Sequence, residues 1–137
     1  MKRKLLEEAI EARKFAYVPY SNFRVGAALL TEDGQIIRGC NIENAAYGPT
    51  NCAERTAFFK AISEGIMDFQ AIAIVGGAGD ELSEGITAPC GICRQVMQEF
   101  CDPGSFLVIL GKRDGSYEEY LLREVLPFGF SPRDLKY

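Results

Sequence analysis

Three cysteines at two places in the chain could together hold a metal ion. Cys52 opens the segment 52–55 (Cys-Ala-Glu-Arg), while Cys90 and Cys93 stand three residues apart in the segment 89–94 (Pro-Cys-Gly-Ile-Cys-Arg). Three thiolates leave one tetrahedral zinc position open, which is typical of a catalytic site, whereas structural zinc sites are closed by four protein ligands. The chain contains no histidine, so an imidazole base and an imidazole ligand are both excluded.

Glu54 is the acidic side chain beside these thiols. It follows Cys52 by two residues, about 200° around a regular helix, so it is poorly placed to share a metal with Cys52 and better placed to face the open position. A zinc-bound water can ionise near neutral pH, and a nearby carboxylate can accept that proton and pass it to a leaving group. We therefore expect a hydrolytic site in which Glu54 is the catalytic proton shuttle.

The charge of such a centre needs compensation. Zn²⁺ with three thiolates has a formal charge of −1, which opposes the ionisation of a bound water. Two helix N-termini would offset this charge, because both cysteine segments are expected at the positive ends of helices. Arg55 and Arg94 directly follow the motif residues. We expect Arg55 to donate hydrogen bonds to the ligand sulfurs, and Arg94 is a weaker candidate for the same role.

Hydrophobic periodicity and turn signals predict the elements that position these residues. Helices are expected over 2–16, 52–63 and 91–100, with Cys52 in the first turn of its helix, and strands over 23–30, 35–42, 69–76, 106–110 and 117–122. The tail 126–132 is rich in turn residues and aromatic residues and is expected to be irregular. This order favours an α/β fold in three layers, α/β/α, with a central mixed five-stranded sheet. Residues 1–137 are expected to form a single domain.

Composition limits the partners and the compartment. The 137 residues carry a net charge of −4, which gives no support to nucleic-acid binding. The longest apolar runs, such as 71–75, have five residues, so no membrane span is expected, and the N-terminus lacks the apolar segment of a signal peptide. Five cysteines, an odd number, favour a reducing compartment and a cytoplasmic protein. Cys40 and Cys101 belong to no motif and are expected to be buried structural thiols.

Several segments resemble the small zinc-dependent cytidine deaminases that act on free nucleosides. They are residues 17–29, 39–48, 52–55, 89–95 and 126–130, in the order that the family has them. The resemblance implies the fold of that family and a hydrolase acting on C–N bonds in cyclic amidines. The implied reaction is deamination of cytidine and deoxycytidine to uridine and deoxyuridine, with release of ammonia, in pyrimidine salvage. One Zn²⁺ per chain would be bound by Cys52, Cys90 and Cys93, its hydroxide would attack C4, and Glu54 would carry protons.

The resemblance also implies a set of substrate-binding residues. Asn41 and Glu43 would bind ribose hydroxyls, Phe23 would pack near the sugar and base, and the backbone of Ala53 would hold the pyrimidine. Similar chains form homotetramers in which neighbouring subunits complete each site. Tyr47 matches the loop tyrosine that crosses to a neighbour. In the tail, Phe130 is the better candidate for stacking on the base, and Phe128 is the weaker one.

Other interpretations stay open at this stage. A deaminase of the same fold could act on another amine, such as a nucleoside antibiotic or a nucleotide, although the loops lack a basic cluster for phosphate. A structural zinc protein closed by Cys40 or Cys101, or a thiol redox protein, belongs to a different class. Glu54 taken alone would more often be a solvated residue of a first helical turn.

Overall fold

The computed structural model describes residues 1–135 and contains one five-stranded sheet with the strand order β2-β1-β3-β4-β5. Its strands are β1 (Phe23–Thr31), β2 (Ile36–Cys40), β3 (Phe69–Ala78), β4 (Leu107–Gly111) and β5 (Tyr117–Leu121). Only β3 and β4 pair in parallel, and the other neighbours are antiparallel. The sheet is therefore mixed, as the sequence predicted.

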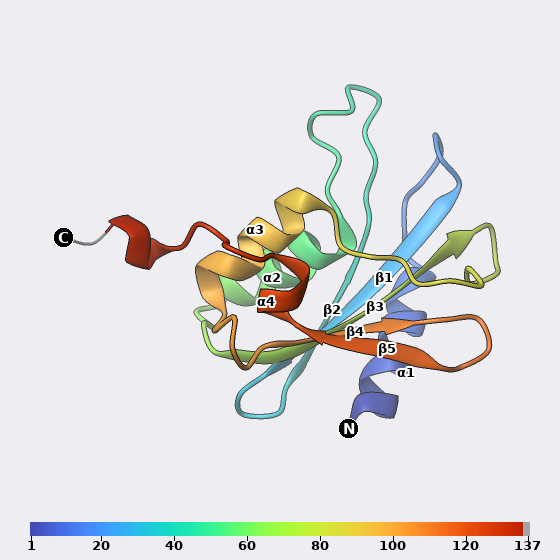
Figure 1. Cartoon of the computed structure of the whole chain (residues 1–137). Coiled ribbons are helices and arrows are strands. Elements are labelled where there is room, and N and C mark those ends of the chain that lie inside the picture. Colours follow the sequence, from blue (N-terminus) through green and yellow to red (C-terminus); the bar gives the residue numbers. More distant parts are fainter. Residues whose placement is uncertain (136–137) are drawn as a thin grey trace.

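Helices cover both faces of this sheet (Figure 1). α1 (Lys2–Arg13) lies on one face, and α2 (Ala53–Ser63) and α3 (Gly91–Phe100) lie on the other. Alternate strand residues serve the two faces: Leu29 and Ile72 pack in the cluster that contains Phe58 of α2, whereas Leu30 packs in the cluster that contains Leu5 of α1. This alternation follows from the two-residue period of a strand. The three-layer α/β/α architecture is confirmed.

One helix and one strand end earlier than the sequence predicted, because backbone hydrogen bonds to distant residues replace the helix and the strand at their C-terminal ends. The first helix ends at Arg13 rather than at residue 16, and the Tyr17 amide donates to the Asn41 carbonyl at 3.0 Å. The second strand ends at Cys40 rather than at residue 42, because Ile42 forms bridges with Tyr17 and with Asn51. These bridges close the base of the loop 43–50, which projects beyond the sheet in Figure 1.

The C-terminal tail contains more regular structure than expected. A short helix, α4 (Leu122–Val125), directly follows β5, and a 3₁₀ turn, η1 (Pro132–Leu135), follows the aromatic segment. Leu122 is fully buried in the cluster of α2 and α3, and the Glu124 carboxylate accepts a 2.7 Å hydrogen bond from the Leu121 amide. Tertiary burial and this cap stabilise a turn that is too short to be recognised from periodicity.

Gly39 allows α2 to begin directly against the sheet. A Cβ atom at this position of β2 would lie 2.4 Å from the Ala53 carbonyl oxygen, which is closer than van der Waals contact permits. Only glycine therefore lets the first turn of α2 approach the strand so closely. None of the helices within residues 1–135 combines the length and the apolar character that crossing a membrane would require.

Candidate functional site

Two of the three candidate metal ligands cap helices. Cys52 is the N-cap residue of α2 and Cys90 is the N-cap residue of α3, and both have extended backbone angles. Cys52 thus precedes its helix, whereas the sequence predicted it within the first turn. Cys93 lies one turn into α3 and is fully buried. The positive ends of both helix dipoles point to the same place, where they stabilise negative charge.

The three sulfur atoms converge to metal-binding distances. The Sγ atoms of Cys52 and Cys90 are 3.6 Å apart, those of Cys90 and Cys93 are 3.4 Å apart, and all three lie within 4.8 Å of one another. Two sulfurs at zinc–sulfur distances of about 2.3 Å in a tetrahedral site are roughly 3.8 Å apart. The observed spacing fits zinc. No other group of three or more such ligands occurs among residues 1–135, so a structural site closed by Cys40 or Cys101 is not supported.

The thiols of Cys52 and Cys93 shift each other's pKa in opposite directions. A hydrogen bond with Cys93, reinforced by one from Arg55, lowers the pKa of the Cys52 thiol to about 5 against the opposing effect of burial. The same bond with Cys52, together with burial, raises the pKa of Cys93. Between Cys52 and Cys93, a single thiolate, on Cys52, is therefore favoured. A divalent cation supplies the charge that lets three thiols ionise together.

Arg55 supports the cluster and Arg94 does not. The Arg55 Nη2 atom donates to Cys52 Sγ at 3.3 Å, as expected for a donor to ligand sulfur. Its Nε atom is buried and has no partner among the described residues. The weaker expectation for Arg94 was wrong: its guanidinium donates to the carbonyls of Pro89 at 2.8 Å and Val125 at 2.9 Å. Arg94 joins the segment before Cys90 to α4.

Glu54 lies in the first turn of α2 beside the thiols, and its side chain is almost completely buried at 4% exposure. Burial raises the pKa of Glu54 to about 7, and the charge of the nearby Cys52 adds to the rise. A carboxyl group with such a pKa can both accept and donate a proton near neutral pH. Glu54 is therefore not the solvated first-turn residue that an isolated glutamate at a helix N-terminus usually is.

Asn41 and Glu43 lie at the base of the projecting loop, beside the strand-like pair Ile42–Asn51 that leads into Cys52. The Asn41 side chain joins β1: its Oδ1 atom accepts from the Val25 amide and its Nδ2 atom donates to the Phe23 carbonyl, both at 2.9 Å. One N–H of the Asn41 amide is left for a ligand. The expected ribose contact thus shares this side chain with a structural role.

Glu43 lines a cavity of about 340 Å³ with Tyr20, Ser21, Tyr47 and Thr50. The Glu43 carboxylate accepts from the amides of Tyr20 at 3.0 Å and Ser21 at 3.1 Å, and also from the Ser21 hydroxyl. The Ser21 hydroxyl and these amides hold the pKa of Glu43 below its usual value. Glu43 is therefore a fixed, ionised acceptor, as binding of sugar hydroxyls requires.

The remaining predicted residues fall into two groups. Ala53 is fully buried at the start of α2, and Phe23 is half-buried at the start of β1. Tyr47, Phe128 and Phe130 are instead exposed, by 73%, 106% and 57% respectively. Among the described residues, Tyr47 lines the cavity of Glu43, whereas neither Phe128 nor Phe130 does.

The sequence did not predict the residues that position Glu43 and Cys52 through hydrogen bonds. Tyr20 and Ser21 position Glu43 through their amides, and the Thr56 hydroxyl donates to the Cys52 carbonyl at 3.1 Å. Thr56 stands four residues after Cys52, the spacing at which a hydroxyl returns to a helix carbonyl, so that signal was available. The partnership of Ser21 with Glu43 spans 22 residues and has no local signal.

Comparison with known proteins identifies the family. Residues 1–108 match the model of the cytidine and deoxycytidylate deaminase zinc-binding region. The chain belongs to this deaminase family. A cytidine deaminase of Sporosarcina psychrophila is 55% identical over 134 residues, 98% of this chain and 94% of the relative. One of Halalkalibacterium halodurans is 54% identical over 131 residues, 96% and 95% of the two chains.

A solved structure supports the same family assignment. The 1.6 Å crystal structure of cytidine deaminase from Burkholderia pseudomallei superimposes on this chain with a TM-score of 0.87 and 48% identity, covering 95% of this chain and 99% of that one. The family is a zinc-binding one, in agreement with the three converging thiols. The predicted fold and the predicted cofactor are confirmed at the level of the family.

Proposed function

We propose that this chain is a cytidine deaminase that converts cytidine and deoxycytidine, with one water molecule, to uridine and deoxyuridine and ammonia, as in pyrimidine salvage. The observation that carries the proposal is the buried Glu54 beside three converging thiols in a member of this family. Cys52, Cys90 and Cys93 would hold one Zn²⁺ per chain, which when bound supplies Lewis-acid activation of the attacking water.

Glu54 moves the protons in this reaction. Its carboxylate accepts a proton from the attacking water, delivers a proton to N3 of the base, and assists the departure of the amine from C4. Burial brings its pKa to about 7, so the carboxylate and the carboxylic acid are both accessible near neutral pH. Arg55 lowers the negative charge on Cys52 through its hydrogen bond, which offsets the formal −1 charge of a three-thiolate zinc centre.

The nucleoside would lie between the thiols and the projecting loop. Glu43, held ionised by Ser21 and Tyr20, accepts from the ribose hydroxyls, and the remaining amide N–H of Asn41 donates to them. Phe23 packs against the sugar and base, and the backbone of Ala53 holds the pyrimidine. The hydrogen bond from Asn41 to the Phe23 carbonyl joins two of these groups directly.

Neighbouring subunits would complete the site in a homotetramer of single-domain chains. Tyr47, Phe128 and Phe130 expose large aromatic surfaces, which is unfavourable in water unless another surface covers them. Tyr47 at the loop and Phe130 in the tail would then contact the nucleoside of an adjacent subunit. Light scattering after gel filtration would measure the mass of the assembly, and a monomer with full activity would contradict this part. The reduced thiols of the centre favour a cytoplasmic location.

The deciding experiment is an absorbance assay with cytidine, deoxycytidine, cytosine and dCMP in parallel. Turnover of the two nucleosides with little turnover of dCMP supports the proposal, whereas preference for dCMP or for another amine would favour the alternative deaminases of this fold. X-ray absorption at the zinc edge should show three sulfurs and one light atom. Four sulfurs would contradict a catalytic centre.

The variant Glu54→Gln tests whether Glu54 carries the protons. This variant should keep its zinc, measured by elemental analysis, and lose turnover by about 10²–10⁴-fold, the usual contribution of general acid–base catalysis. Glu64→Gln, at the exposed end of the same helix, is the matched control and should retain full activity. Wild-type turnover by Glu54→Gln would exclude Glu54 as the proton carrier.

A further inference from the structure

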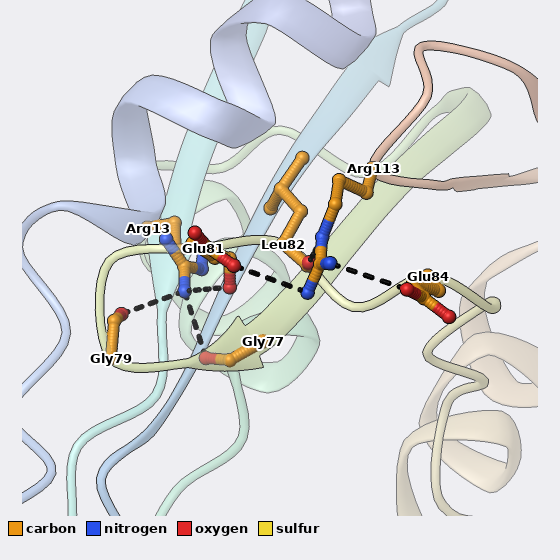
Figure 2. Close-up of polar contacts among 7 residues, drawn as sticks. All are labelled: Arg13, Gly77, Gly79, Glu81, Leu82, Glu84 and Arg113. Atoms are coloured by element: carbon orange, nitrogen blue, oxygen red, sulfur yellow. Dashed lines mark hydrogen bonds and ion pairs between the residues drawn. The ribbon is translucent and has the colours of Figure 1, made fainter.

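Arg13 is a buried guanidinium on the opposite face of the sheet from the thiols. It is the last residue of α1 and is only 6% exposed. Its Nε atom donates to the Arg24 carbonyl at 3.1 Å, and its Nη2 atom approaches the carbonyls of Gly77, Gly79 and Glu81 at 2.8, 2.8 and 2.9 Å. Figure 2 shows the last three contacts. No carboxylate forms an ion pair with Arg13 in the part of the chain that the structure describes.

Two of these carbonyls, those of Arg24 and Gly77, lie at the end of the β1–β3 ladder, and those of Gly79 and Glu81 lie in the loop that follows β3. Arg24 of β1 pairs with Gly77 of β3, and just beyond them the Gly79 amide donates to the Asn22 carbonyl at 2.9 Å. Arg13 therefore bridges the two strands where both leave the sheet. A planar guanidinium with several fixed donors suits this task, because one group can satisfy acceptors from separate segments at once.

Arg13 can reach these carbonyls because α1 packs closely against β1. Gly26 of β1 has no side chain, and a Cβ atom there would lie 2.6 Å from the Arg13 backbone nitrogen. Gly26 and Arg24 share the face of β1 that meets α1, since side chains alternate along a strand. Phe23 and Val25 belong to the other face, where Val25 packs in the cluster with α2 and α3.

Phe23 thus lies on the thiol side of a backbone that Arg13 fixes from the other side. The Phe23 carbonyl accepts the Asn41 amide, and the Asn41 Oδ1 atom accepts the Val25 amide. We propose that Arg13 is a positioning residue for the nucleoside: by locking the end of the β1–β3 ladder, it holds Phe23, and Asn41 bonded to it, in the orientation that binds sugar and base. This inference rests on the proposed function.

Arg113, in the turn between β4 and β5, offers a control because it bonds to the same loop after β3 that Arg13 contacts. Its Nε atom donates to the Leu82 carbonyl at 2.6 Å, and its guanidinium pairs with the carboxylates of Glu81 and Glu84, both at 3.4 Å (Figure 2). The Arg113 side chain is 47% exposed, and it makes no hydrogen bond to residues 22–25 in the described structure. Arg113→Ala perturbs the loop without touching the end of β1.

The test compares Arg13→Lys, Arg13→Gly and Arg113→Ala with the wild-type protein. Lysine keeps the charge but replaces the planar fork by one nitrogen. For Arg13→Lys we expect KM for cytidine to rise roughly tenfold with kcat changed less than threefold, since misplacing a binding group by about 1 Å costs up to 10²-fold. Uridine binding measured by calorimetry should weaken by a similar factor. In Arg13→Gly, millimolar guanidinium should partly restore KM.

Hydrogen exchange gives a readout that does not depend on turnover. Amides of residues 22–25 and 77–79 should exchange faster in Arg13→Lys and at the wild-type rate in Arg113→Ala. A purely structural Arg13 would lower the melting temperature and the active fraction, which reduces kcat and leaves KM unchanged. Unchanged KM and unchanged exchange at residues 22–25 would therefore overturn the inference. If the wild-type protein deaminated none of the nucleosides, the proposed function would fail, and exchange alone would decide whether Arg13 holds this segment.

Discussion

Replacing Arg55 by glutamine should separate zinc affinity from folding stability. Arg55 donates a 3.3 Å hydrogen bond to Cys52 Sγ. A hydrogen bond to a charged group contributes about 1.5–3 kcal/mol, and each 1.4 kcal/mol corresponds to a factor of ten. The dissociation constant of zinc should therefore rise roughly 10- to 100-fold in Arg55→Gln, the range usual for residues that bond to metal ligands.

The folding stability of the zinc-free protein should respond differently. The Arg55 Nε atom is buried and has no hydrogen-bond partner within residues 1–135, and such a group costs about 1–3 kcal/mol. Glutamine removes that group, so the free energy of unfolding without zinc should fall little or even rise. The sign of the effect thus differs between zinc affinity and zinc-free stability.

Chelator competition would measure the zinc affinity, and urea unfolding of the chelated protein would measure the stability. Arg38→Gln is the charge-matched control, because the Arg38 guanidinium bonds to Glu8 rather than to a thiol. It should leave zinc affinity within about twofold of wild type, as is usual for exposed charges. Equal zinc affinity in Arg55→Gln and wild type would refute the role of Arg55 at the sulfur.

Three further experiments test the packing of α2 on the sheet, the pKa of Glu43 and the bound metal. Gly39→Ala places a Cβ atom 2.4 Å from the Ala53 carbonyl and should destabilise the fold by about 1–3 kcal/mol in urea unfolding, whereas Gly85→Ala, with open space around it, should not. Ser21→Ala removes the hydroxyl that most strongly lowers the pKa of Glu43, so that pKa should rise toward its usual value in a carboxyl NMR titration; in the wild type, Glu43 stays ionised to lower pH. Removal of zinc by a chelator should lower the melting temperature, because three thiols within 4.8 Å of one another lose the cation that joins α2 to α3, and an unchanged melting temperature would argue against a bound metal.

Local signals in the sequence were sufficient for most of the fold. The Asp33-Gly34 turn marked the first hairpin, and the apolar runs around Ile72 and Val108 marked buried strands. Errors arose where distant residues decide the structure. The early end of α1 depends on the pairing of Tyr17 with Asn41, and α4 depends on the burial of Leu122. Neither interaction can be recognised from the residues that neighbour it in the sequence.

In the site, too, the residues with local sequence signals were predicted and those with distant partners were not. The spacing of Cys90 and Cys93 and the offset of Glu54 from Cys52 are local, so the thiol cluster and the acid beside it could be predicted. Arg94 could not be assigned from its neighbours, because its acceptor at Val125 is 31 residues away. Residue types at short spacing thus predict the chemistry, while the supporting hydrogen bonds emerge only in the folded chain.

The meeting of Cys52 with Cys90 has a cause in the handedness of the chain. The connections β2–α2–β3 and β3–α3–β4 each join parallel strands and advance across the sheet in the same direction. Such crossovers are right-handed in nearly all proteins, and two right-handed crossovers that advance together must lie on one face. With one crossover left-handed, its helix would lie beside α1, and the sheet would separate the sulfurs. The metal centre is therefore a product of chirality, which no residue of its motifs specifies alone.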